Sequence, residues 1–313
     1  MKITLSDSQV MLGIESDHAM ALALPALPGE HQLMSVAGTS ILANFCAIDT
    51  KETKLERVIG LLGALLEKVQ QAAVEGIDFA ALPVYWLLPQ LDESPDNASL
   101  QRWASALNQE FGELFSHQGS QFFANGRCAL PLALQALKVQ VQAQSERDEQ
   151  PKGAYFIALD SCIDQLNELS AQQQLISIDA DEGLVPSEGA IFTCVNVSEQ
   201  GSVQGLTPCL NVDLVRHEIT SHNQTSQGIE HLFCYASDLL AGESFLAQCY
   251  MPGNGQLMLT QHWLDAYLQL AKVVNGQTAI VQTAFFTGEL GAVTGLYNML
   301  HIYQGYCLQE LSG

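Results

Sequence analysis

Basic residues are scarce in this 313-residue chain, which has 12 Lys and Arg against 34 Asp and Glu and a formal net charge of −22. Beyond residue 200 the only basic side chains are those of Arg216 and Lys272. Proteins that bind DNA, RNA or anionic lipids neutralise phosphate groups with Lys and Arg. We therefore expect neither a nucleic acid nor a membrane among the partners of this protein.

Paired cysteines and long apolar runs are also missing. The eight cysteines are dispersed and none forms a Cys-x-x-Cys pair, so we expect free, mostly buried thiols and no metal site. No stretch reaches the roughly 18 apolar residues of a membrane span, and the N-terminus has no run of signal-peptide length. These absences predict a cytoplasmic protein.

The pattern of the remaining residues predicts an α/β fold. Aromatic residues make up 7% of the chain and apolar residues 48%, a mixture that suits helices packed against sheets. The hydrophobic periodicity predicts helices over residues 52–75, 98–115, 129–141, 163–169, 261–274 and 291–306. It predicts strands over residues 82–88, 121–123, 153–159, 188–197, 232–236 and 278–286, with an exposed loop over 142–152. A polar, glycine-containing stretch at 198–207 divides the chain into predicted halves, 1–200 and 201–313.

Four segments stand out as carriers of chemistry. Residues 123–130 read Phe-Ala-Asn-Gly-Arg-Cys-Ala-Leu, a strand, a tight turn and a helix start. Residues 158–166 contain Asp160-Ser161 after a predicted strand, and residues 183–192 carry a Pro-Ser-Glu-Gly turn that enters another. Residues 287–295 form a glycine-bearing turn at the start of the last predicted helix.

In this order and at these separations the four segments resemble the β-ketoacyl synthase family of the thiolase-like superfamily. The resemblance covers roughly residues 50–306. It implies a five-layer αβαβα fold of two similar halves with mixed, mostly parallel sheets, paired into a dimer through the first half. It also implies a setting in fatty acid or polyketide biosynthesis and no bound cofactor. In active members, a Cys at a helix N-terminus attacks the thioester, and two His residues, or a His and an Asn, stabilise the developing negative charge.

The sequence departs from that pattern at each catalytic position. Aligning Gly126 with the glycine of the family's Cys-x-x-Gly turn puts Phe123 at the position of the nucleophile. One family histidine falls near Gly288 or Glu289, and no His-Gly-Thr-Gly-Thr segment lies between residues 211 and 258 for the other. The chain stops at residue 313, before the strands with which the family ends. We therefore expect a pocket formed by Phe123, Asn125, Gly126, Gly288 and Glu289, without the catalytic set.

Other residues offer weaker alternatives. Cys128, at a predicted helix start, is the alternative nucleophile, although a thiol packed in the first turn is the simpler interpretation. His231 and Cys234 form a His-x-x-Cys pair, but two ligands do not make a zinc site, and on a strand they would face opposite ways.

Loop and turn residues have plainer roles. The spacing of four acidic residues does not match that of a calcium-binding loop, so we expect them to lie in a solvated turn; they are Asp179, Asp181, Glu182 and Glu188. We expect Asp160 and Ser161 to cap a helix. The spacing of Gly288, Gly291 and Gly295 is not that of a phosphate-binding loop.

The sequence therefore predicts a ketosynthase-like protein without condensing activity that acts as a binding or assembly partner. One alternative is an acyl-transfer enzyme that uses Cys128. Another is a subunit, like a chain-length factor, paired with an active ketosynthase. The expected partners are a second copy or another ketosynthase-like chain, and an acyl thioester or a carrier protein. A charge of −22 makes a poor docking surface for an acidic carrier protein.

Overall fold

The computed structural model describes residues 1–48, 53–73, 76–91, 97–145, 153–198, 210–212, 225–240, 242 and 245–308. The described helices are α1 (His18–Leu22), α2 (Lys54–Ala72), α3 (Ala98–Glu110), α4 (Ala129–Ser145), α5 (Leu166–Ala171), α6 (Thr225–Leu240), α7 (Leu257–Tyr267), α8 (Thr283–Thr287) and α9 (Val293–Cys307). The described strands are β1 (Lys2–Leu12), β2 (Gln32–Val36), β3 (Thr39–Ala43), β4 (Val84–Leu87), β5 (Gln121–Phe123), β6 (Gly153–Ser161), β7 (Glu188–Ser198), β8 (Leu210–Asn211), β9 (Gln248–Tyr250) and β10 (Ala279–Val281).

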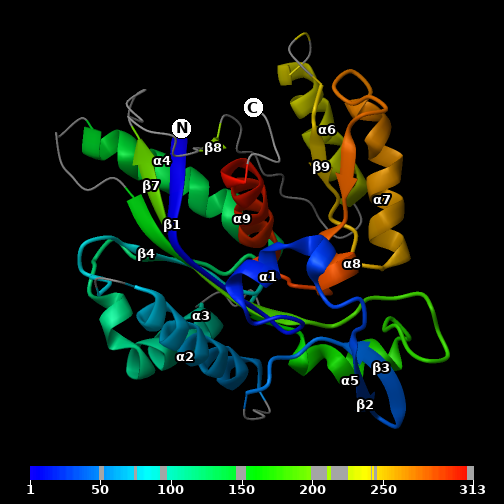
Figure 1. Cartoon of the computed structure of the whole chain (residues 1–313), viewed down its shortest axis with the longest axis horizontal. Coiled ribbons are helices and arrows are strands. Elements are labelled where there is room, and N and C mark those ends of the chain that lie inside the picture. Colours follow the sequence, from blue (N-terminus) through cyan, green and yellow to red (C-terminus); the bar gives the residue numbers. More distant parts are fainter. Residues whose placement is uncertain are drawn as a thin grey trace.

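A six-stranded mixed sheet forms the centre of the molecule, in the order β5-β4-β6-β7-β1-β8 (Figure 1). Strands β5, β4 and β6 are parallel to one another. Strand β7 is antiparallel to both β6 and β1, and β8 is antiparallel to β1. Four strands therefore run one way and two the other, which confirms the predicted mixed, mostly parallel sheet of an α/β fold.

Helices cover both faces of this sheet because its strands are apolar on both sides. In β4, Trp86 packs with α2 and α3 in one core cluster. Its neighbours Tyr85 and Leu87 point to the opposite cluster, where α4 and α9 pack. Successive side chains of this strand therefore point into two different hydrophobic cores. This is expected for the buried strand predicted at residues 82–88 (Figure 1).

Strand β1 was not expected, because the first 50 residues show little regular pattern. It lies between β7 and β8, and its register against β7 shifts between Ser6 and Gln9. At this irregularity Asp7 has a φ of 51°, and the Ser8 hydroxyl hydrogen-bonds to the Thr193 hydroxyl at 2.8 Å. A bulge of polar residues interrupts the alternation on which strand prediction depends.

Two predictions in the second half were wrong. Residues 232–236 were expected to be a strand but lie inside helix α6, where Phe233 packs edge-on against Trp263 of α7. The aromatic composition of this short run favoured a strand, whereas contacts with α7 stabilise a helix. The strand expected over 278–286 is only β10, and the chain then turns into α8.

Most of the remaining helices lie near their expected positions, but α4 continues to Ser145, into the loop predicted over 142–152, and α7 ends at Tyr267 instead of 274. Helix α7 starts four residues early, at Leu257, and the helix expected over 98–115 ends at Glu110 before a 3₁₀ turn, Gly112–Phe115. Helix α9 confirms the prediction for 291–306. Most of the predicted boundary region, 199–207, lies outside the described residues, so the division into halves stays a prediction.

Within the described part of the second half, β9 and β10 form a two-stranded parallel sheet beside α6 and α7 (Figure 1). Helix α9 instead joins the core of the first sheet, where Val293, Leu296 and Leu300 are buried. None of the described helices is long and apolar enough to cross a lipid bilayer.

Candidate functional site

The four segments singled out from the sequence meet at one end of the central sheet. The backbone N–H of Glu289 donates to the Val185 carbonyl at 2.8 Å, and that of Cys162 donates to the Ser187 carbonyl at 3.2 Å. Arg127 reaches Glu289 across 162 residues of sequence. Residues that follow β6, precede β7 and form the turns before α4 and α9 therefore make up one cluster.

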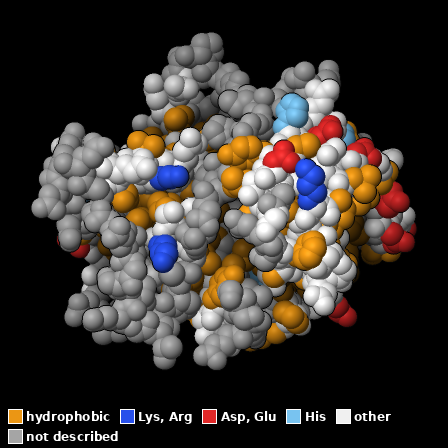
Figure 2. Space-filling model, turned by 90° about the horizontal axis from the view of Figure 1, so that it is seen from above, with side chains coloured by type: hydrophobic (Ala, Val, Ile, Leu, Met, Phe, Trp, Pro, Cys, Tyr) orange, Lys and Arg blue, Asp and Glu red, His pale blue; other side chains and the backbone are white. Residues whose placement is uncertain are grey.

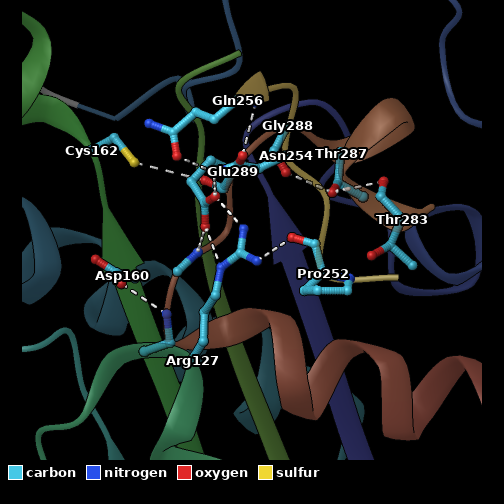
Figure 3. Close-up of polar contacts among 12 residues, drawn as sticks. Arg127, Asp160, Cys162, Pro252, Asn254, Gln256, Thr283, Thr287, Gly288 and Glu289 are labelled. Carbon is cyan, nitrogen blue, oxygen red and sulfur yellow. Dashed lines mark hydrogen bonds and ion pairs between the residues drawn. The ribbon is translucent and has the colours of Figure 1, made fainter. Parts of the chain in front are cut away.

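The centre of the cluster is the carboxylate of Glu289 (Figure 3). The guanidinium of Arg127 forms an ion pair with it and also donates to the carbonyl of Pro252. The Asn254 amide donates to the same carboxylate, and so does the backbone N–H of Gly291, at 2.8 Å. The carboxylate is thus bound by donors from three separate parts of the chain.

These donors decide the charge state of Glu289, whose side chain is only 11% exposed. Burial by itself raises the pKa of this carboxyl. The Arg127 charge, with hydrogen bonds from Arg127, Asn254 and Gly291, outweighs burial and holds the pKa below its ordinary value. Glu289 is therefore ionised at neutral pH, and Arg127 is the counter-charge.

A second buried carboxylate, Asp160, joins β6 to the start of α9. It accepts hydrogen bonds from the backbone N–H groups of Ser161 and Ala292, both at 2.8 Å. Burial raises its pKa to about 6, against the opposing effect of Lys54, whose amino group lies 3.6 Å away. The prediction that Asp160 and Ser161 cap a helix near Ile163 was wrong, because the 3₁₀ turn Ile163–Gln165 has no side-chain cap and Asp160 instead binds the N–H of Ala292. The Ser161 hydroxyl accepts from the Ile163 N–H at 3.3 Å.

The predicted nucleophile corner lies at the end of β5. The Leu88 N–H donates to the Phe123 carbonyl and the Gly126 N–H donates to the Leu88 carbonyl, both at 3.1 Å. Gly126 has a φ of 55°, a left-handed conformation that glycine adopts easily. The half-buried ring of Phe123 packs against the ring of Tyr85, with 5.3 Å between the two ring centroids. The corner therefore holds a packed phenyl ring and a tight turn through Asn125.

Two thiols lie near this cluster. Cys128 is exposed, and partial burial raises its pKa although Arg127 acts in the opposite direction. Cys162 is buried and donates its S–H to the Glu289 carbonyl at 3.8 Å. Burial and the nearby Asp160 and Glu289 raise its pKa well above the ordinary value. Both thiols are therefore protonated at neutral pH.

Glycine is required at two positions of the turn before α9. Gly288 has a φ of 75°, and a Cβ there would lie 2.8 Å from Ser187 Cβ and from the Val185 carbonyl oxygen. Gly291 has a φ of 53°, and its Cβ would lie 2.0 Å from Asp160 Oδ2. Close packing and a positive φ account for both glycines.

The candidate metal residues do not come together. His231 and Cys234 lie one turn apart on α6, so the expectation that they face opposite sides of a strand was wrong. Asp179, Asp181 and Glu182 are exposed, as predicted. Glu188 is instead fully buried in an ion pair with Arg57, at 2.6 Å. No group of three His, Cys, Asp or Glu residues in the described part of the chain has the geometry of a metal site.

Sequence reasoning missed Pro252, Asn254 and the pairing of Arg127. Residues 252–256 read Pro-Gly-Asn-Gly-Gln, with glycines spaced as in the family's His-Gly-Thr-Gly-Thr pattern and Pro252 in place of histidine. This segment follows β9 and brings Asn254 to Glu289 (Figure 3). The glycine spacing is a signal in the sequence that could have located this segment.

A cavity of about 520 Å³ opens beside the cluster. Asn254 and Val185 line it, together with apolar residues of α8 and the turn before β2. Phe123 and Cys128 are not among its lining residues.

No family model and no curated protein matches the sequence. Solved structures do match. One is a type II polyketide synthase acyl-carrier protein in complex with its ketosynthase bound to the hexaketide, with a TM-score of 0.59 and 11% identity over 97% of this chain and 86% of that chain. Another is the ketosynthase from module 6 of the bacillaene synthase of Bacillus subtilis, with a TM-score of 0.59 and 12% identity over 97% of this chain and 61% of that chain.

The chain has a ketosynthase-like thiolase fold. An oxazolomycin ketosynthase domain from Streptomyces albus agrees, with a TM-score of 0.58 and 10% identity over 97% of this chain and 62% of that chain. This chain spans less than two thirds of the length of the bacillaene and oxazolomycin ketosynthase chains. At these identities the likeness establishes the fold and leaves the activity to the residues of the site.

Proposed function

We propose that this protein is a ketosynthase-like binding or assembly partner without condensing activity. The observation that carries the proposal is the Arg127–Glu289 ion pair beside the Phe123 corner. The resemblance requires a thiol and imidazoles here, whereas this chain has a phenyl ring, a carboxylate and a proline.

The chemistry of condensation explains why these replacements matter. A thiolate must attack the acyl carbon, and hydrogen-bond donors must stabilise the oxyanion and enolate that follow. The ionised carboxylate of Glu289 repels negative charge, and it neutralises the Arg127 guanidinium that would attract it. Pro252 has no side-chain donor. The cluster therefore opposes the charge that condensation develops.

Incubation of the purified protein with malonyl- and acyl-thioesters tests this proposal. We expect neither condensation product nor carbon dioxide above the background of a protein-free sample. Turnover that copurifies with the protein and disappears in Glu289→Gln or Cys162→Ser would show an active site and overturn the proposal.

An acyl-transfer enzyme that uses Cys128 is the second candidate. Its exposure at the turn before α4 favours this role, while its raised pKa opposes it, because the thiolate is the nucleophile. Mass spectrometry after incubation with an acyl thioester separates the two. An acyl adduct on Cys128 that is lost in Cys128→Ala would support acyl transfer. An unmodified Cys128 would rule out acyl transfer through this residue.

The surface of the second half supports a protein partner. Large apolar side chains are exposed there, among them Leu264 of α7, Leu268 of the 3₁₀ turn that follows α7, and Phe285 of α8. Figure 2 shows exposed hydrophobic side chains among the described residues of the face seen from above. Exposed apolar surface of this kind marks association sites. We propose a second copy or another ketosynthase-like chain as the partner, and copurification with a ketosynthase chain tests it.

A carrier protein is the other proposed partner, because one structural neighbour is a carrier protein complex. Charge weighs against tight docking, since this chain carries −22 and acidic surfaces repel. We expect weak binding to an acidic carrier protein that strengthens with added salt. Micromolar binding that weakens with salt would show an unforeseen basic docking surface.

A further inference from the structure

The cavity beside the cluster has the size of a small-molecule site. Its volume of about 520 Å³ lies within the roughly 300–1,000 Å³ of typical ligand pockets. Apolar side chains of Leu27, Met251 and Phe286 form much of its wall. Apolar walls with a few polar groups are the usual composition of such sites.

No Lys, Arg, Asp or Glu is among the residues that line this cavity. A buried charge without a partner is costly, so an ionic ligand would lose its hydration without an ion pair in return. The net charge of −22 adds a field that repels anions. The nearest cation described above, Arg127, is already paired with Glu289.

Four polar side chains line the cavity: His31, Asn254, Thr260 and Gln282. His31 is held through its Nδ1 by the fully buried amide of Asn44, 3.0 Å away. That amide also donates to the Thr287 carbonyl at 3.1 Å, which fixes its position. Within the described residues no partner is seen for His31 Nε2, so this ring nitrogen is left for a ligand.

The wall is preformed by backbone contacts between glycines. Gly255 has a φ of 95°, and a Cβ there would lie 1.9 Å from the Gly183 carbonyl oxygen. Gly183 itself has a φ of 137°. Side chains at these two positions would force the loops apart, so the cavity depends on glycine at both.

We infer that this cavity binds a neutral, mainly apolar small molecule with at least one hydrogen-bonding group, and that it discriminates against anions. The inference rests on the proposed binding function. It concerns a space that neither Phe123 nor Cys128 lines.

Two fluorescent probes that differ by one charge test the inference. N-phenyl-1-naphthylamine is neutral, and 1-anilinonaphthalene-8-sulfonate is the same ring system with a sulfonate. The intact protein is titrated with each, and fluorescence is recorded. We expect saturable binding of the neutral probe at one site per chain and at least tenfold weaker binding of the sulfonate.

Filling variants locate the site. Ala284→Trp and Thr260→Trp each place an indole on a lining position, and each is expected to reduce binding of the neutral probe at least tenfold. Leu239→Trp adds the same ring at an exposed position of α6 that does not line the cavity and is expected to bind as the parent does. Far-ultraviolet circular dichroism and melting temperature identify a variant that has not folded.

Exposed apolar surface is the competing explanation for probe binding. The Leu257→Ser/Met258→Ser double variant removes two side chains that are each 70% exposed on α7. Probe binding that survives Trp at both lining positions, that is lost in the double serine variant, or that is equal for the two probes overturns the inference. Thioester turnover is measured separately, so an active enzyme would contradict the proposed function and leave the cavity result to stand alone.

Discussion

At the scale of single residues, the site depends on a buried carboxylate whose ionised form requires bound donors. Glu289 is buried and ionised because Arg127 and Asn254 bind it. The pair therefore holds together the chain segments that meet at this site. A buried ion pair is costly to break from one side only, because the remaining charge has no partner.

Breaking the pair is expected to destabilise the protein. Arg127→Met should lower the free energy of unfolding by about 3 kcal/mol, and adding Glu289→Gln should recover more than half of that loss. The control is Lys272→Met, which breaks an ion pair with Asp238 whose side chains are 66% and 71% exposed. It should cost less than about 0.5 kcal/mol. Denaturant unfolding measures all three, and equal losses from Arg127→Met and Lys272→Met would contradict this role.

The raised pKa of Asp160 predicts a dependence of stability on pH. Its folded-state pKa is about 6 and its reference value is 3.8, so the folded state binds the proton more tightly. The favourable contribution is complete below about pH 4 and is lost as the pH rises through about 6. Asp160→Asn lacks this titration, so its free energy of unfolding should fall less between pH 4 and 7 than that of the parent. Parallel curves from chemical denaturation would show that Asp160 titrates normally.

At the scale of elements, the turn before α9 determines where the segments meet. Asp160 accepts from the Ala292 N–H at the start of this helix, and Gly291 leaves room for the carboxylate. Helices and strands with regular periodicity, such as α2, β4 and β6, were predicted close to their observed bounds. Strand β1 and helix α6 were not, because a polar bulge hid the first and aromatic residues gave the second the composition of a strand.

Substitution of Gly291 tests the role of this turn. Gly291→Ala should destabilise the protein by about 2–3 kcal/mol, because its Cβ would collide with Asp160 and its φ is positive. Gly276→Ala is the matched control, since nothing lies within 4 Å of its added Cβ. It should change stability by no more than about 0.5 kcal/mol. Melting temperatures that fall equally in both variants would remove the special role of Gly291.

At the scale of the whole molecule, net charge opposes the compact state. Twenty-two uncompensated negative charges repel one another, and added salt screens that repulsion beyond a Debye length of about 10 Å at 0.1 M. The ion pairs Arg57–Glu188 and Arg127–Glu289 are buried or partly buried and are screened less.

We therefore expect sodium chloride to stabilise the protein. Raising it from 0.05 to 0.5 M should increase the melting temperature by several degrees, because a stability change of about 1 kcal/mol shifts the midpoint of a chain of this size by roughly 2–4 °C. Differential scanning calorimetry measures the change. A melting temperature that falls with salt would mean that exposed ion pairs contribute more to stability than repulsion costs.

The amino-acid sequence by itself determined the α/β class, most helices and buried strands, and the four segments that carry the site. It did so because hydrophobic periodicity and turn residues act over short stretches of chain. Only the tertiary structure decided that Arg127 pairs with Glu289, that Asn254 joins them and that a cavity without charged lining residues opens alongside. These contacts join residues up to 162 positions apart, and no local pattern encodes which distant donor reaches a buried carboxylate.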